Sequence, residues 1–263
     1  MTITKNLCWE VVTGEFDAEM TGVLDDLEKQ RTHLAPCFIM IDPFGVSGTP
    51  MSVVQRIFQN PRSEVYISFM YEWINRFKEV PEFEKHLDEL FGCGDWRNGV
   101  DIADPEQRKD YLCGLYESQL RDAGARHVIL FDLFEGDRLV YTIFFGTQSE
   151  TGCNRMKEAI WKIDPIQGCA FRGSKSRQPL LNLGEPDFRP LQQALIEQFG
   201  GKGWVRVEEV ISFVQSDRTD YYESQLRKGA LRPMEAEGKI QVSASPKRRK
   251  GTFPTGTLLL FLP

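Results

Sequence analysis

The sequence predicts an α/β protein built from two parts, and three observations support this prediction. Residues 37–41 (CFIMI) and 63–70 (SEVYISFM) are short apolar runs, and each is followed by a stretch with helical spacing. Residues 127–147 contain two strand-like runs around an EGD turn signal, which is typical of a hairpin. A separate series of helix and strand signals begins at residue 189. Strands that alternate with helices indicate a parallel sheet with right-handed crossovers.

Local signals justify each element of the first part. Residues 16–30 place apolar side chains at helical spacing, and Pro50 suits the first turn of a helix. The continuous run at 37–41 fits a strand that is covered on both faces. Further helices are predicted at residues 71–78, 105–123 and 151–164. This order of elements resembles the second half of a Rossmann-like, methyltransferase-type domain, which we assign to residues 1–168.

The second part is predicted to be a winged helix at residues 189–263. Residues 169–188 are rich in Gly, Pro, Ser and basic residues and are interpreted as a linker. Three helices, a strand, a basic loop and a second strand follow, with residues 246–256 as the wing. Pro233 is expected to kink or divide the third helix. The buried stripe of that helix is predicted at Tyr222, Leu226, Ala230 and Met234.

Charge is divided unevenly between the two parts. The chain has 263 residues and a net charge of -6, but residues 201–263 carry +4 and residues 1–200 carry -10. This asymmetry suggests different partners for the two parts. Nucleic-acid phosphate contacts are predicted at Arg227, Lys228, Lys247, Arg248, Arg249 and Lys250. The alternatives are a solubilising turn or a winged helix that binds protein.

Composition excludes several classes of protein. No apolar stretch approaches the length of a transmembrane helix, and the N-terminus lacks a signal-peptide pattern. The six cysteines contain no CxxC pair, so we expect reduced thiols and a cytoplasmic location. The three histidines lack metal-ligand spacing, and no metal is expected. No phosphate-binding P-loop or Ser-His-Asp arrangement supports a kinase or a hydrolase.

The stretch FIMIDPFGVSG, residues 38–48, is the main candidate for an active-site loop. Ligands of open α/β sheets bind beyond the carboxyl ends of the strands, where Asp42 is predicted to lie. Pro43 restricts the backbone, Phe44 offers a face for stacking, and Gly45 permits a tight turn. The alternative is that Asp42 only caps a turn and Phe44 only packs.

Two further residues are candidates for substrate contacts. Arg76 lies on a helix that begins at the end of a strand, where it could contact an anion or face solvent. Trp96 lies in a loop near the same edge, where it could stack on a base or pack internally. Lys157 and Trp161 are four residues apart on one helix face, which indicates packing with a lysine whose amino group reaches solvent.

Six motifs in order resemble the bacterial three-Cys-motif partner (TcmP) family over residues 10–263. They are IDPFG, SEVYISFMYEWINRF, FGCGDW, YLCGLYESQL, YTIFFGT and MKEAIW. The resemblance implies a methyltransferase-like protein and a radical-SAM-type partner with three cysteines. The Asp42 loop is also similar to the D/N-P-P-Y/F loop of amino-group methyltransferases, although Phe44 stands where that loop has its second proline.

The resemblance further implies S-adenosylmethionine as the cofactor, but the glycine-rich FAGPG-type loop that usually binds it is absent. We therefore expect this chain alone to be inactive. A sheet without the corresponding strands would expose an unpaired edge. That edge predicts an association with an upstream half-chain or with a second copy.

The leading hypothesis is a methyltransferase-like component that acts on, or is recruited to, nucleic acid in DNA repair, modification or phage defence. The alternatives are a non-catalytic DNA-binding adaptor for the radical-SAM-type protein and a protein-binding scaffold.

Overall fold

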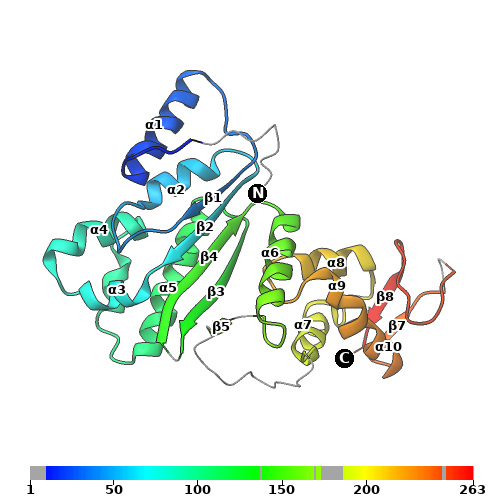
Figure 1. Cartoon of the computed structure of the whole chain (residues 1–263). Coiled ribbons are helices and arrows are strands. Elements are labelled where there is room, and N and C mark those ends of the chain that lie inside the picture. Colours follow the sequence, from blue (N-terminus) through cyan, green and yellow to red (C-terminus); the bar gives the residue numbers. More distant parts are fainter. Residues whose placement is uncertain (1–9, 137, 169, 173–185, 245–246, 263) are drawn as a thin grey trace, which may run out of the picture.

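The computed structural model describes residues 10–136, 138–168, 170–172, 186–244 and 247–262. It is a mixed α/β structure with one sheet in the body, residues 10–172, and another in the C-terminal module, residues 186–262 (Figure 1). Each part has its own cluster of buried apolar side chains, and Trp161 of the body joins the cluster of the module. Among the described residues, no helix has both the length and the apolar composition needed to cross a lipid bilayer.

The strands of the body are β1 (Cys37–Ile41), β2 (Ser63–Phe69), β3 (His127–Glu135), β4 (Arg138–Thr147) and β5 (Ala170–Arg172). They form a five-stranded sheet with the order β1-β2-β4-β3-β5. β1 is parallel to β2, β4 is antiparallel to β2 and β3, and β5 is parallel to β3. The predicted parallel pair and the predicted hairpin are both confirmed.

Helices cover the two faces of this sheet unequally. In chain order the helical segments are α1 (Phe16–Lys29), α2 (Met51–Phe58), α3 (Tyr71–Phe77), α4 (Pro81–Phe91), the short 3-10 helix η1 (Asp95–Gly99), α5 (Pro105–Asp122) and α6 (Glu150–Ile163). α2, α4 and α5 share a core with Ile67 of β2. On the opposite face, Ile160 of α6 packs with Phe131 and Ile143. Figure 1 shows α6 beside β3 and β4.

β1 is an edge strand of the described sheet, which corrects the prediction that residues 37–41 are covered on both faces. Phe38 and Met40 are 54% and 62% exposed, whereas Ile41 is buried. The ring of Phe38 lies near Tyr66 and Phe145, and together with residues of α6 it borders a pocket on this face. An apolar run by itself does not distinguish a strand with two covered faces from an edge strand with one open face.

The C-terminal module contains α7 (Arg189–Phe199), β6 (Trp204–Arg206), α8 (Val207–Gln215), α9 (Glu223–Gln225), the π-helical segment η2 (Leu226–Leu231), α10 (Arg232–Ala236), β7 (Ile240–Val242) and β8 (Leu258–Phe261). The strand order is β6-β8-β7, and β8 is antiparallel to both neighbours. The helices and the last two strands agree with the predicted order, and β6 is an additional strand.

The third helix of the module changes from π-helical to α-helical hydrogen bonding just before Pro233. η2 has π-helical bonding, and α10 begins one residue before the proline. Because proline lacks an N–H and its ring clashes with the carbonyl four residues earlier, a regular α-helix does not continue through it undisturbed. The predicted division is confirmed, and Leu226, Ala230 and Met234 are buried as predicted, whereas Tyr222 is only partly buried.

β5 extends the sheet of the body beyond the predicted domain boundary at residue 168, because its three residues pair with β3. Of the predicted linker at 169–188, residue 169 and residues 173–185 lie outside the described residues.

Candidate functional site

The loop after β1 turns sharply at the carboxyl end of the strand, as the sequence predicts. Asp42 is exposed directly after β1. Gly45 and Gly48 have φ angles of 108° and 81°, which are left-handed conformations that favour glycine. The backbone N–H of Gly45 donates to Sδ of Met70 at 3.1 Å. This contact holds the loop against the end of β2, so two neighbouring strand ends meet here.

The Asp42 loop lines a cavity of about 750 Å³, which the start of α1 and the end of α4 also border. The carboxylic acids in its lining are Glu15, Asp17, Asp42 and Glu89. His86 is the titratable base among the lining residues. Thr49 is 3% exposed, and its buried hydroxyl has no hydrogen-bond partner among the described residues. Carboxylates in this number favour a ligand that is positively charged or donates hydrogen bonds.

Phe44 is the most exposed large apolar side chain of this loop, with 92% of its surface accessible. Its ring lies 5.9 Å from Trp73, at an interplanar angle of 59°. Contacts between successive rings continue this pair into an aromatic row of Phe44, Trp73, Phe77, Phe83 and His86. Because His86 also lines the cavity, both ends of the aromatic row border it. The sequence pattern pointed to Phe44 but not to the other members of the row.

Arg76 and Trp96, the predicted substrate contacts, are not among the residues that line this cavity. Arg76 is exposed, and its guanidinium lies 5.3 Å from the ring centre of Phe77, so it borders the aromatic row. Trp96 is 2% exposed and donates its Nε1–H to Asp88 at 2.8 Å. The ring of Trp96 therefore belongs to the core, and the structure supports internal packing in place of base stacking.

A second group of candidates lies on two segments of the C-terminal module, η2 and the segment between β7 and β8, and is called the basic surface below. Its exposed cations are Arg227, Lys228, Lys247, Arg249 and Lys250. Arg248 does not share this exposure, because it forms an ion pair with Glu235 at 2.6 Å in which both side chains are about nine-tenths buried. The predicted phosphate contact at Arg248 is thereby corrected: its guanidinium bonds within the protein. Arg248 and Arg249 are adjacent in the sequence, which gives no sign that one is paired internally and the other is exposed.

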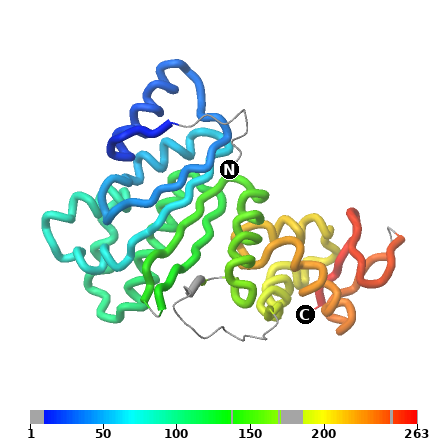
Figure 2. The backbone as a smooth tube through the Cα atoms, in the orientation of Figure 1, coloured from blue at the N-terminus to red at the C-terminus, as the bar shows by residue number. Residues whose placement is uncertain are grey.

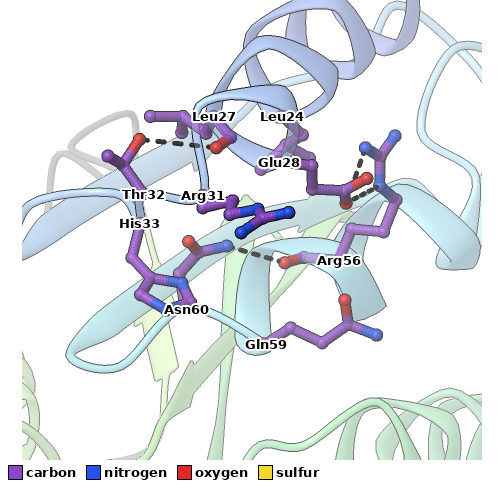
Figure 3. A pocket seen from close by; sticks show the side chains of 9 residues that line it. All are labelled: Leu24, Leu27, Glu28, Arg31, Thr32, His33, Arg56, Gln59 and Asn60. Carbon is purple, nitrogen blue, oxygen red and sulfur yellow. Dashed lines mark hydrogen bonds and ion pairs between the residues drawn. The ribbon is translucent and has the colours of Figure 1, made fainter.

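The cavity between α1 and α2, about 330 Å³ in volume, has a polar lining that mainly holds these helices together (Figure 3). Nη2 of Arg56 donates to Asp25 at 2.6 Å and to Glu28 at 2.9 Å. Asn60 donates to the carbonyl of Arg56 and accepts from the N–H of Leu34. Because these polar groups form hydrogen bonds and ion pairs within the protein, we assign the lining of this cavity a structural role.

The body and the C-terminal module meet at a polar joint centred on Lys157. Lys157 is 2% exposed, and its ammonium donates to the carbonyls of Val214, Ser216 and Thr219 at 2.5, 2.6 and 3.0 Å. Burial lowers the pKa of Lys157 to about 8. The expectation that its amino group reaches solvent is wrong, because the 214–219 segment covers the helix face. Trp161 donates its Nε1–H to the carbonyl of Asp220, the residue after this segment, at 2.7 Å.

Asp217 anchors the other side of the joint. Its carboxylate accepts from the N–H of Val128 at 2.9 Å, contacts Nδ1 of His127 at 3.2 Å and pairs with Arg121 at 2.8 Å. Burial alone would raise the pKa of Asp217, but these hydrogen bonds outweigh it and hold the pKa below its ordinary value. The joint therefore fixes the C-terminal module to β3, α5 and α6.

Within the described ranges, no three His, Cys, Asp or Glu side chains are grouped closely enough to hold a metal ion. Comparisons of the chain with protein-family models, with curated proteins and with solved structures find no match.

Proposed function

We propose that this chain is a methyltransferase-like component that acts on, or is recruited to, nucleic acid, and that it is related to the three-Cys-motif partner proteins. The Asp42 loop is the observation that supports this proposal best. It presents an acid, a tight turn and an exposed aromatic ring at the carboxyl end of a parallel strand, beside an acid-lined cavity. This edge is where open α/β sheets bind ligands. The parallel pair followed by an antiparallel hairpin also fits the second half of a methyltransferase-type sheet.

The residues of the cavity are suited to S-adenosylmethionine in charge. This cofactor carries a sulfonium cation, and carboxylates and aromatic faces attract cations. Asp42, Glu89 and Phe44 would provide these groups. The cofactor would supply a methyl group, Asp42 would position the accepting group through a hydrogen bond, and Phe44 would stack on a base.

The remaining cofactor contacts are assigned to a partner that pairs with the edge of β1. The strand CFIMI has no charged residue and no proline, which are the features that usually protect a sheet edge. Phe38 and Met40 are more than half exposed on one face of it. A half-chain or a second copy that adds a strand here would cover this surface and complete the site.

The C-terminal module is proposed to bind nucleic acid as a winged helix. Its order of helix, strand, helix, helix, strand and strand, with an antiparallel three-stranded sheet, fits that fold. The exposed cations of the basic surface lie on the third helix and on the segment between β7 and β8, the predicted wing. These cations would neutralise phosphates and release counterions, so binding should weaken steeply with salt.

The first test is calorimetric titration of the purified chain with S-adenosylmethionine. Micromolar binding that Asp42→Asn abolishes and Asp122→Asn preserves would support a cofactor site in the cavity; Asp122 is an exposed acid on α5 and serves as the control. If the wild-type chain produces no binding heat, the titration is repeated with the candidate partner half-chain. Absence of binding in both titrations would refute the enzyme proposal.

The alternative is a non-catalytic DNA-binding adaptor for a radical-SAM-type protein. The charge distribution favours it, because residues 1–200 carry a net charge of -10, which repels nucleic acid from the Asp42 loop. Salt-dependent DNA binding without any cofactor binding would support this alternative. Absence of both would favour a protein-binding scaffold.

A further inference from the structure

The turn between β7 and β8 is held by one buried carboxylate. Glu235 of α10 accepts from Nη2 of Arg248 at 2.6 Å, from Nη1 of the same arginine at 3.4 Å and from the backbone N–H of Gly251 at 3.0 Å. The Arg248 guanidinium holds the pKa of Glu235 below its ordinary value, so the carboxylate stays charged. One side chain thus ties two points of the turn to α10.

Arg248 extends this attachment to the far side of the turn. Its Nη1 also donates to the carbonyl of Thr252 at 3.2 Å, and its guanidinium lies 5.6 Å from the ring centre of Phe253. Phe253 is 2% exposed within the core of the module. Arg232 of α10 donates to the carbonyl of Gly251 at 2.8 Å. The neighbours of Arg248 in the sequence project from this anchored turn into solvent.

We infer that Glu235 and Arg248 are positioning residues that hold the turn so that Lys247, Arg249 and Lys250 face nucleic acid. Arg248 itself makes no phosphate contact. This inference rests on the proposed nucleic-acid binding of the C-terminal module. It assigns phosphate contacts to Lys247, Arg249 and Lys250 and a structural ion pair to Arg248.

The substitution Glu235→Gln distinguishes a positioning role from a purely electrostatic role, because the two roles predict opposite changes in nucleic-acid affinity. Removal of a carboxylate near a basic surface should strengthen the binding of a polyanion if charge alone matters. The positioning role predicts the opposite, because the amide loses the ion pair with Arg248 and replaces one of the two acceptor oxygens with a donor, which weakens the attachment of the turn. Glu237→Gln is the matched control: Glu237 lies two residues away, is exposed and pairs with Lys239 at 2.6 Å. That substitution should leave nucleic-acid affinity unchanged or raise it.

The experiment measures the anisotropy of a fluorescein-labelled DNA duplex of about two helical turns, titrated with each full-length variant over a series of salt concentrations. Lys247→Ala, Arg249→Ala and Lys250→Ala should each reduce the slope of log affinity against log salt, by up to about 0.9 per lost phosphate contact. Arg248→Met and Glu235→Gln should lower affinity about three- to tenfold at every salt concentration and leave the slope unchanged. A slope reduced in Arg248→Met, or tighter binding by Glu235→Gln, would overturn the inference.

Hydrogen exchange of the amides in residues 247–252 tests the positioning without nucleic acid. Exchange should accelerate at least tenfold in Glu235→Gln and stay at the wild-type rate in Glu237→Gln. Arg248→Lys, which keeps the charge but loses the forked donor geometry, should give an intermediate rate. Unchanged exchange in Glu235→Gln overturns the inference. If exchange accelerates as expected while the wild-type chain binds no duplex, the anchored turn is supported and the proposed nucleic-acid function fails.

Discussion

Substitution of Lys157 by methionine should destabilise the joint between the body and the C-terminal module by about 3 kcal/mol. The substitution leaves three buried carbonyls, those of Val214, Ser216 and Thr219, without their donor. An unsatisfied buried acceptor costs about 1–3 kcal/mol, so the three together cost about 6 kcal/mol. Methionine also removes the cost of burying a charge. That cost is about 3 kcal/mol, because the pKa of Lys157 is about 8 in the folded chain and 10.5 in the unfolded chain. The net destabilisation is therefore about 3 kcal/mol.

The assay is urea unfolding followed by tryptophan fluorescence, to which Trp161 at the joint contributes. Lys162→Met is the control, because Lys162 lies on the same helix with 73% of its side chain exposed. That control should change the free energy of unfolding by less than about 0.5 kcal/mol. Equal stability of the two variants would refute the assignment of Lys157 as a central contact of the joint.

The pH dependence of this difference has a defined sign. The charge on Lys157 is disfavoured in the fold, so between pH 8 and 10.5 the unfolded chain binds more protons than the folded chain. The stability of the wild type relative to Lys157→Met should therefore increase as the pH rises through this window. A difference that shrinks there would show that the folded protein favours the ammonium, contrary to the burial argument.

Three other substitutions test the joint, the core and the sheet edge. The contribution of Asp217 is present above its ordinary pKa of 3.8 and is lost as the pH falls through its lower folded value, so Asp217→Asn should flatten the loss of stability measured by urea unfolding in acidic buffers. Trp96→Phe should lower the free energy of unfolding by about 1 kcal/mol through its lost hydrogen bond and leave S-adenosylmethionine affinity unchanged, whereas substitution of the half-exposed Trp204 should be nearly neutral. Met40→Lys should abolish any self-association seen by light scattering, whereas lysine at the equally apolar, exposed Val23 should not; persistence in Met40→Lys would exclude the β1 edge as the interface.

Local sequence signals predicted most of the elements of the body, because short-range interactions determine where those elements begin and end. The side chain of Asp104 accepts hydrogen bonds from the N–H groups of Glu106 and Gln107, which fixes the start of α5. α4 was not predicted, although Pro81 occupies its first turn and the apolar Leu87 and Leu90, which are buried, lie three residues apart. β6 was missed for another reason, since its three residues continue directly into α8 and leave no room for a strand period.

The roles of individual candidates depended on contacts between distant residues, and the sequence did not reveal these contacts. Trp96 is buried because η1 folds back onto Asp88 of α4. Arg248 is internal because Glu235, on another element, lies within 2.6 Å. Lys157 is buried because a segment about sixty residues later covers it. Asp42 differs from these three, since its position at a strand end follows from local order alone.

The positions of the two candidate sites limit how they could cooperate. In Figures 1 and 2, α4, which lines the Asp42 cavity, lies at one end of the molecule, and β7 and β8 of the C-terminal module lie at the other. The joint at Lys157 holds these ends apart, so nucleic acid bound on the basic surface reaches the Asp42 loop of the same chain only if it extends along the whole body. The acids around that loop oppose such a path. We therefore expect the two binding activities to separate: substitutions on the basic surface should leave cofactor affinity unchanged, and Asp42→Asn should leave the nucleic-acid affinity of the basic surface unchanged. If nucleic acid bound to the basic surface changed the cofactor affinity of the same chain, the nucleic acid would have to reach the Asp42 loop along a path that the charge distribution disfavours. That result would contradict the assignment of separate roles to the two sites.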